Sequence, residues 1–341
     1  MTTRRNFLKN TTMLAAGLGV SPLLSSSPLR SYQKEEVING KVRIAVIGVG
    51  MGCRDLQGAL TDNPWVHCVG MCDVNKVRLE EQLARFKKDF PEQTVSIKAY
   101  TDFREVLANK EIDGVIIATP DHWHPYIFAE ALKAGKAIYV EKPVGNSISE
   151  CNAMMDFQKK YKGVVTTGLW QTSQRYFRAA NEILKSGVLG DVYKVQLWLC
   201  QSTNPRPSVE DSEAPSTLDY DMWLGPAPER PFNNSRFRGW RGFWDYGGGQ
   251  QTDWGVHWID SAFDGLKALG LCDREYPDAV FSIAYKDPAS FNETPSCQTS
   301  IFQYKNFHIE WAQQVAYLYN RNQGVAWVGS KATLVCNREG Y

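Results

Sequence analysis

The stretch Val42-Arg43-Ile44-Ala45-Val46-Ile47-Gly48-Val49-Gly50-Met51-Gly52-Cys53 decides the fold of the first part of the chain. Its first six residues are mostly apolar and β-branched, so they predict a buried strand. The glycines that follow predict a tight turn into a helix that begins near Arg54. Such a turn lets the main chain approach a pyrophosphate at the positive end of a helix. The candidate contacts are Gly48, Gly50, Met51 and Gly52.

One position of this turn departs from the usual pattern. Cys53 stands where a G-x-G-x-x-G turn has its third glycine, which lets the helix pack closely on the strand. An ordinary strand, turn and helix without a ligand therefore remains the alternative for this stretch.

Length and composition exclude several classes of protein. With 341 residues and 43% hydrophobic content, the chain is too apolar for a disordered protein and long enough for two domains of about 100–200 residues. Its 38 Lys and Arg balance 37 Asp and Glu without a basic stripe, which argues against a nucleic-acid partner. Its 8 cysteines form no pair of CxxC motifs, so neither a structural zinc site nor a disulfide scaffold is predicted.

The first 32 residues predict an export signal rather than part of the fold, followed by a linker at 33–40. Arg4-Arg5 and Phe7-Leu8 precede the apolar run 13–20, which is the order of a twin-arginine signal for proteins exported in the folded state. The run is shorter than the roughly 20 residues of a membrane-spanning helix, and no later apolar run is long enough to span a membrane. We expect a periplasmic or cell-envelope location. An amphipathic tail is the alternative, and whether the signal is cleaved stays open.

Residues 41–150 alternate strands with helices, so they predict a parallel sheet. The second strand, Val66–Cys72, ends in Asp73, where a ribose-binding carboxylate is expected about 20 residues after the glycine turn. A carboxylate accepts hydrogen bonds from the ribose 2′-hydroxyl and repels a 2′-phosphate, which favours NAD over NADP. A helix N-cap is the alternative role of Asp73.

Two further strands of this domain end in polar residues. The strand 114–118 leads to Thr119-Pro120-Asp121-His122-Trp123-His124, and Ala137–Val140 leads to Glu141-Lys142-Pro143. Ligands of parallel sheets bind at these carboxyl ends, so Lys142 is expected to contact the nicotinamide ribose or the reacting oxygen, with a surface lysine as the alternative. His122 and His124 lack a characteristic metal-ligand spacing, and no metal is predicted.

The segments GVGMGCRD, CDVN, ATPDHWH and VEKPV, in this order, resemble the Gfo/Idh/MocA family of NAD(P)-dependent sugar and cyclitol oxidoreductases. The resemblance implies an α/β fold, with an N-terminal Rossmann doubly wound parallel sheet and a C-terminal α/β domain built on a large, mostly antiparallel sheet. It places the family's catalytic lysine on Lys142. It also implies that Glu141 and the loop with Thr119, Pro120 and His124 form part of the cofactor pocket, and it leaves His122 to face the substrate.

Residues 151–341 predict a substrate and oligomerisation domain. Short strands separated by turn residues, at 192–200, 279–285, 299–304, 308–311 and 324–329, are typical of an antiparallel sheet, through which a homo-oligomer is expected. Members of the family continue beyond the position that resembles Tyr341, so a C-terminally truncated domain is a further expectation.

A long loop at 202–250 is rich in tryptophan and arginine. Long loops in compact domains are usually functional, and flat aromatic rings stack on the apolar faces of sugars. Trp240 and Trp244 are therefore candidate substrate contacts. A self-packed loop or an oligomer contact is the alternative.

Asp253, His257 and Asp260 have the spacing i, i+4 and i+7, so on a helix they share one face. A histidine oriented by a carboxylate can move a proton near neutral pH. Helix capping and core packing are the alternatives when these residues are read alone. The resemblance places the family's DxGxH motif on Asp253, Gly255 and His257, which implies a catalytic group with Lys142, and gives Asp260 a substrate-binding role.

Together these features predict an NAD-dependent oxidoreductase that transfers hydride between nicotinamide and a secondary hydroxyl or ketone of a sugar, polyol or sugar derivative. Tightly held cofactor would suit an exported enzyme. The first alternative is a redox-neutral glycosidase that oxidises a sugar transiently, although the tyrosine–histidine pairing of such relatives is not evident. A non-catalytic sugar-binding protein is the second alternative.

Overall fold

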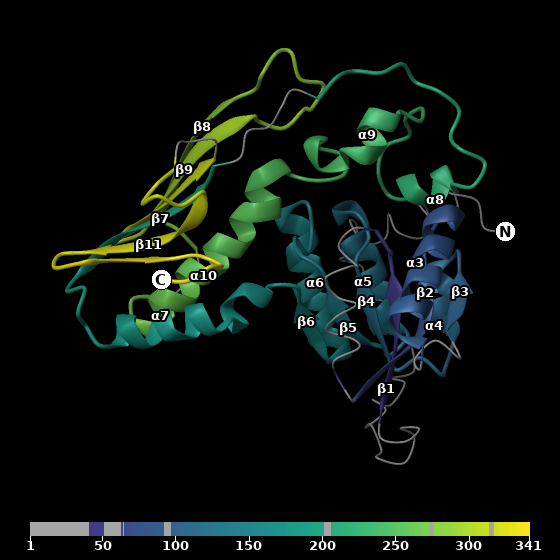
Figure 1. Ribbon diagram of the computed structural model, residues 1–341, viewed down its shortest axis with the longest axis horizontal. Coiled ribbons are helices and arrows are strands. Elements are labelled where there is room, and N and C mark those ends of the chain that lie inside the picture. Colours follow the sequence, from purple (N-terminus) through teal and green to yellow (C-terminus); the bar gives the residue numbers. More distant parts are fainter. Residues whose placement is uncertain are drawn as a thin grey trace, which may run out of the picture. The chain divides into compact units, whose positions relative to one another are not determined.

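The computed structural model describes residues 41–50, 63, 65–91, 97–200, 206–272, 276–313 and 317–341. The chain divides into two compact units (Figure 1). The first runs to Gly168 and also contains Asp211–Phe232, whereas the second consists of Leu169–Glu210 and Asn233–Tyr341. The predicted export signal, the linker, and the candidate contacts Met51 and Gly52 lie outside the described residues.

The first unit contains a parallel sheet of six strands in the order β3-β2-β1-β4-β5-β6. The chain begins at the central strand β1 and adds β2 and β3 on one side of it. It then crosses to the other side of β1, where β4 follows. The turns after β1 and β4 are therefore neighbours at the point where the strand order reverses, which is where such sheets bind ligands. The strands are β1 Val42–Ile47, β2 Val66–Cys72, β3 Lys98–Tyr100, β4 Gly114–Ile117, β5 Ala137–Val140 and β6 Val165–Thr167.

Helices cover both faces of this sheet because successive side chains of each strand point to opposite faces. On one face, Val46 packs in a cluster with Leu79 and Phe86 of α3. On the other, its neighbours Ala45 and Ile47 pack with side chains of α4, α5 and α6. The helices are α3 Lys76–Asp89, α4 Phe103–Ala108, α5 His124–Lys133 and α6 Ile148–Tyr161. The predicted doubly wound sheet is confirmed.

The boundary of the first unit differs from the predicted position at residue 150. A capping box between Ser147 and Glu150 starts α6 at that point, and β6 then pairs in parallel with β5. Because both elements extend the same core, the unit continues to Gly168.

A segment within the predicted long loop also belongs to the first unit. Residues 211–232 contain the short helix α8 Tyr220–Leu224 and a bridge between Leu218 and Asn75. The Lys76 amide donates to the Thr217 carbonyl over 2.9 Å, and the Asp219 amide donates to the Val74 carbonyl over 3.0 Å. These main-chain bonds attach the segment beside the start of α3.

The second unit contains a sheet in the order β12-β11-β7-β10-β9-β8, in which only β7 and β10 pair in parallel. This confirms the predicted, mostly antiparallel sheet. The strands are β7 Val192–Leu199, β8 Ala279–Tyr285, β9 Cys297–Gln303, β10 His308–Gln313, β11 Gln323–Gly329 and β12 Thr333–Cys336.

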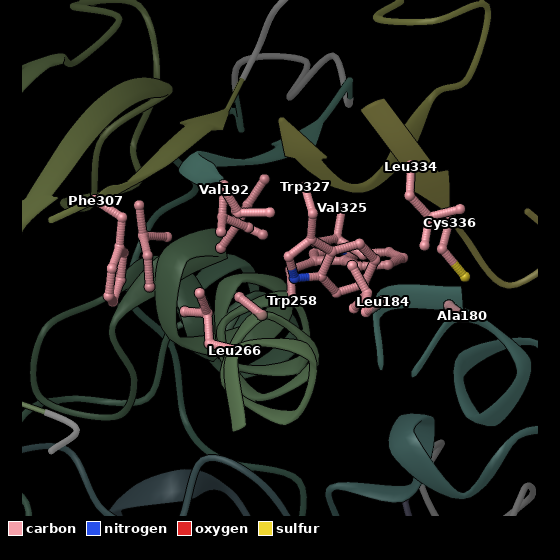
Figure 2. Close-up of a cluster of buried hydrophobic side chains, with 14 of the residues drawn as sticks. Ala180, Leu184, Val192, Trp258, Leu266, Phe307, Val325, Trp327, Leu334 and Cys336 are labelled. Carbon is pink, nitrogen blue, oxygen red and sulfur yellow. The ribbon is translucent and has the colours of Figure 1, made fainter. Parts of the chain in front are cut away.

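One face of this sheet is covered by α7 Arg175–Lys185 and α10 Val256–Ala268. The short helix α9 Asn234–Arg238 lies in the segment that was predicted as a long loop. Figure 2 shows Trp258 and Leu266 of α10 against Val192, Val325 and Trp327 of the sheet. The indoles of Trp258, Trp311 and Trp327 are at most 1% exposed. Within the described part of the chain, no helix has the length and apolarity needed to cross a bilayer.

Candidate functional site

The turn after β1 packs against the main chain that follows β4. Gly48 has φ +88°, and a Cβ atom built on it would lie 2.6 Å from the Ala118 carbonyl oxygen. Its amide donates to the Cys72 carbonyl over 2.8 Å. Only glycine fits here, because any side chain would meet main-chain atoms in a backbone conformation that L-residues rarely adopt. The first glycine of the motif thus brings two strand ends into direct contact.

Asp73 lies beside the same turn. Its Oδ2 accepts from the Val49 amide over 3.0 Å, and its Oδ1 accepts from the Asn75 amide over 2.9 Å. Burial nevertheless raises the pKa of this carboxyl group above its usual value, while the two amides and Arg78 oppose the rise. The N-cap of α3 is Asn75, not Asp73, because the Asn75 side chain accepts from the Arg78 amide. The alternative of a capping role for Asp73 is therefore wrong.

Arg78 is a residue that the sequence analysis missed. Its Nη1 lies 3.5 Å from the position that a Cβ atom of Gly50 would take. A guanidinium group beside a glycine turn is well suited to a phosphate, because its donors match phosphate oxygens in pairs. The sequence offers little signal for it, since Arg78 is only one of many charged residues of α3.

The loop after β4 presents one hydroxyl and holds one imidazole. Thr119 Oγ1 is buried and has no hydrogen-bond partner among the described residues, so it is a donor available to a ligand. Pro120 precedes a short 3₁₀ turn at Asp121–Trp123. His124 is 1% exposed, with Nδ1 2.7 Å from the Pro143 carbonyl oxygen and Nε2 2.9 Å from the Thr119 carbonyl oxygen.

His124 is therefore placed differently from the expectation of a direct cofactor contact. Both of its ring nitrogens face main-chain carbonyls of the protein. The imidazole joins the loop after β4 to the turn after β5. It therefore holds together two segments that are expected to form the cofactor pocket.

Lys142 lies on the turn after β5. The Glu141 carboxylate accepts from the Lys142 amide over 3.2 Å and from the Tyr139 hydroxyl over 3.1 Å, and it lies against Gly168. The next peptide bond, Lys142–Pro143, is cis, and the Pro143 carbonyl contacts His124. The hydrogen bond of the Lys142 amide and the contact of the Pro143 carbonyl fix the main chain on both sides of Lys142. Glu141 acts within the protein as a support of this turn.

His122 is also placed differently from its predicted substrate role. It is 4% exposed, and its Nε2 lies 3.0 Å from the Trp223 carbonyl oxygen. Trp123 Nε1 donates to the Met222 carbonyl over 3.0 Å, and its ring leaves no room for a side chain at Gly225. The two residues attach segment 211–232 to the first unit, which is a contact across about 100 residues that the sequence does not reveal.

Asp253, His257 and Asp260 lie in the second unit, on the predicted helix. The helix begins with a π turn at Gln251–Gly255 and continues as α10. Asp253 Oδ1 lies 3.1 Å from Arg241 Nε in an ion pair, and His257 is 4% exposed. The Trp170 ring meets the His257 ring edge-on, with centroids 5.7 Å apart. A carboxylate and an imidazole on one helix start are the groups that proton transfer needs.

The two predicted aromatic contacts differ in exposure. Trp240 is half-buried, with the Arg241 guanidinium 4.2 Å from its ring centre. Trp244 is 57% exposed, and its amide donates to Glu293 Oε2 over 3.0 Å. Trp244 therefore offers a free aromatic surface. Across the described ranges, no group of three His, Cys, Asp or Glu is arranged to hold a metal ion.

Two family models match the chain. The NAD-binding Rossmann fold of the Gfo/Idh/MocA oxidoreductase family matches residues 42–169, and the C-terminal alpha/beta domain of that family matches residues 178–267. Residues 42–169 are thus an NAD-binding Rossmann domain. The positive φ at Gly48, the Asp73 carboxylate and the unpartnered Thr119 hydroxyl fit a dinucleotide at this sheet edge.

Curated relatives match parts of the chain. An α-N-acetylgalactosaminidase of Tannerella forsythia is 33% identical over 163 residues, which cover 44% of this chain and 34% of that protein. An inositol 2-dehydrogenase of Salmonella typhimurium is 24% identical over 151 residues, covering 44% and 43% respectively. The chain thus spans less than half the length of either relative.

Solved structures share the fold. The WlbA dehydrogenase from Bordetella pertussis, in complex with NADH and UDP-GlcNAcA, has a TM-score of 0.64 at 18% identity and covers 86% of this chain and 79% of its own. GenD2 from gentamicin A biosynthesis, in complex with NAD, has a TM-score of 0.65 at 18% identity, with 93% and 75% covered.

The first prediction concerns Asp73. Asp73→Asn is expected to weaken NAD binding about ten- to a hundredfold, because a hydrogen bond to a charged group contributes about 1.5–3 kcal/mol. NADP binding should fall less, since a repulsive charge is removed. As the pKa of Asp73 is raised, the affinity of the wild type for NAD should begin to fall at a higher pH than an ordinary aspartate would dictate. The variant should lack this dependence.

Calorimetric titration with NAD and NADP measures both effects. Asp89→Asn, at an exposed carboxylate at the end of α3, is the matched control and should bind like the wild type. Structural damage would lower both affinities equally. An unchanged ratio of NAD to NADP affinity in Asp73→Asn would contradict the assignment of Asp73 to the ribose.

Proposed function

Because the chain belongs to the Gfo/Idh/MocA oxidoreductase family, we propose that it is an NAD-dependent oxidoreductase acting on a sugar, polyol or sugar derivative. It would transfer hydride between nicotinamide and a secondary hydroxyl or ketone. The observation that carries this proposal is the turn of Lys142, fixed on both sides at the carboxyl edge of the NAD-binding sheet. Inositol 2-dehydrogenase and the sugar-nucleotide complex of WlbA support the substrate class.

The proposed roles follow from the chemistry of each group. NAD, when bound, supplies the hydride acceptor. The Lys142 ammonium stabilises negative charge on the reacting oxygen. His257 takes the hydroxyl proton, since an imidazole can exchange a proton near neutral pH, and Asp253 assists it from the preceding turn. Asp260 and the exposed ring of Trp244 are the candidate substrate contacts.

A redox-neutral glycosidase is the second candidate. The match to an α-N-acetylgalactosaminidase favours it, as does a glycosyl hydrolase family 109 protein of Parabacteroides distasonis, which is 27% identical over 201 residues. Bound NAD would supply a transient acceptor for hydride from the carbon that carries a sugar hydroxyl. The aglycone would then leave by elimination, water would add in its place, and return of the hydride would restore the hydroxyl. NAD is regenerated, so no net reduction accumulates.

Activity measurements on protein purified from the cell-envelope fraction test both candidates. Native mass spectrometry is expected to find bound NAD. Incubation with a panel of sugars should then reduce this NAD, which is measured by the absorbance of the reduced nicotinamide. Lys142→Met and His257→Asn should each lower the rate about a hundredfold or more. Arg175→Lys, at an exposed residue of α7, is the control and should keep the wild-type rate.

Each other outcome has a distinct meaning. Release of aglycone from glycosides without net reduction of NAD would support the glycosidase and contradict the dehydrogenase. Absence of NAD binding would contradict both enzymes and leave a non-catalytic sugar-binding protein.

The order of charges and apolar residues at 1–32 supports export by the twin-arginine route. Recovery of the chain only from the cytoplasm would contradict that location.

We also propose a homo-oligomer formed through the sheet of the second unit. On the edge strand β8, Phe281, Ile283 and Tyr285 are 64%, 65% and 56% exposed. Phe281 pairs with Ile301, whose neighbour in β10 is Glu310. By alternation these side chains lie on the face opposite to Trp311 and the covering helices. An exposed apolar strip of this kind is typical of an interface.

The combined change Phe281→Lys and Ile283→Lys is expected to produce monomers, because it places two charges in the apolar strip. Sedimentation velocity distinguishes the species. Val188→Lys changes a residue of similar exposure, 54%, after α7 and should leave the assembly intact. A monomeric wild type, or an oligomer that survives the double change, would contradict the proposal.

A further inference from the structure

Arg338 is held on a rigid turn that follows β12. Asn337 is 1% exposed, and its Oδ1 accepts from the amides of Glu339 and Gly340 over 2.9 and 3.1 Å. Arg321 Nη1 donates to the same oxygen over 2.6 Å and to the Gly340 carbonyl over 2.8 Å. The main chain around Arg338 is therefore fixed, and this limits where its side chain reaches.

The Arg338 guanidinium lies among tryptophan rings. Its central carbon is 4.6 Å from the ring centre of Trp254, 4.7 Å from that of Trp170, and 5.9 Å from that of Trp258. A guanidinium over indole faces is attracted by their negative potential, and the attraction grows with desolvation. Arg338 thus joins two separate stretches of the second unit, the 3₁₀ turn that begins at Trp170 and the helix that carries Trp254 and Trp258.

A hydrogen-bond route leads from Arg338 to His257. Arg338 Nε donates to Gln171 Oε1 over 3.0 Å, which orients the Gln171 amide. Gln171 Nε2 then donates to Ser261 Oγ over 2.9 Å and to the His257 carbonyl over 3.4 Å, and Ser261 Oγ donates to the same carbonyl over 3.0 Å. Gln171 is fully buried. Without the Arg338 donor, its Oε1 would lose this bond in a place that water does not reach.

We propose that Arg338 is a positioning residue for His257. It holds Trp170 and Gln171 against α10, so that the Trp170 ring keeps its edge-on contact with the imidazole. The catalytic part of this inference rests on the proposed function. Proton transfer depends on the position of the imidazole within a fraction of an ångström, so loosening this support slows turnover without touching the cofactor site.

The test uses the full chain with histidine ¹³C-labelled at the ring carbon Cε1, so that the 5 histidines give one ring signal each. In Arg338→Met the His257 signal is expected to shift, because the Trp170 ring moves relative to it, while the other four signals stay in place. Arg338→Lys keeps the charge but loses the planar stack and the Nε donor, so it should restore the signal only in part.

Arg175→Lys is the matched control, since the Arg175 guanidinium also stacks on an aromatic ring, 4.6 Å from the centre of Tyr176, but on the exposed side of α7. It should leave all five signals unchanged. Gln171→Met breaks the same route without altering Arg338, so it should reproduce the His257 shift and serves if Arg338→Met fails to fold. An unchanged His257 signal in both variants would overturn the proposal.

Turnover supplies the second readout. Arg338→Met is expected to lower kcat about tenfold or more while the affinity for NAD stays as in the wild type. A fall in NAD affinity with unchanged kcat would contradict a positioning role. If the wild type has no turnover with any sugar or glycoside, the proposed function fails, yet the histidine signals still decide whether Arg338 positions His257.

Discussion

The first unit depends on one close approach of main chain to main chain. The turn after β1 passes so near to Ala118 that no side chain fits at Gly48. This contact brings the ends of two central, hydrogen-bonded strands to the same edge, where main-chain amides can face an anionic ligand. Asp73, which follows the second strand, stabilises this turn by accepting a hydrogen bond from the Val49 amide. The NAD site is therefore a consequence of sheet packing as much as of the glycine motif.

In both units, buried or half-buried polar side chains bind main-chain atoms beside the candidate catalytic residues. In the first unit, His124 and Glu141 fix the turn of Lys142. In the second, Gln171 and Ser261 bind the carbonyl of His257. Buried polar groups are costly when unpaired, so such networks specify one arrangement of the chain. A rigid scaffold of this kind is what a hydride and proton transfer requires.

The sequence predicts elements well where local pattern decides them. The predicted strands 42–47, 66–72, 137–140 and 279–285 have the observed bounds, because apolar runs end at glycine, charge or proline. Side-chain partners across long separations escape this reasoning. His122 bonds to Trp223 across 101 residues, and Arg338 bonds to Gln171 across 167, so their roles follow only from the fold. The π turn that contains Asp253 was likewise not predicted from the sequence.

The NAD affinity of Gly48→Ala, measured by calorimetric titration of the full chain, tests directly whether the cofactor binds at this edge of the sheet. We expect binding about a hundredfold weaker or more, because the new methyl group must displace the main chain at Ala118. Gly135→Ala is the matched control, with φ +71° in the same unit but nothing within 4 Å of the added atom, and it should bind NAD as the wild type does. Wild-type affinity in Gly48→Ala would contradict the placement of the cofactor at this edge.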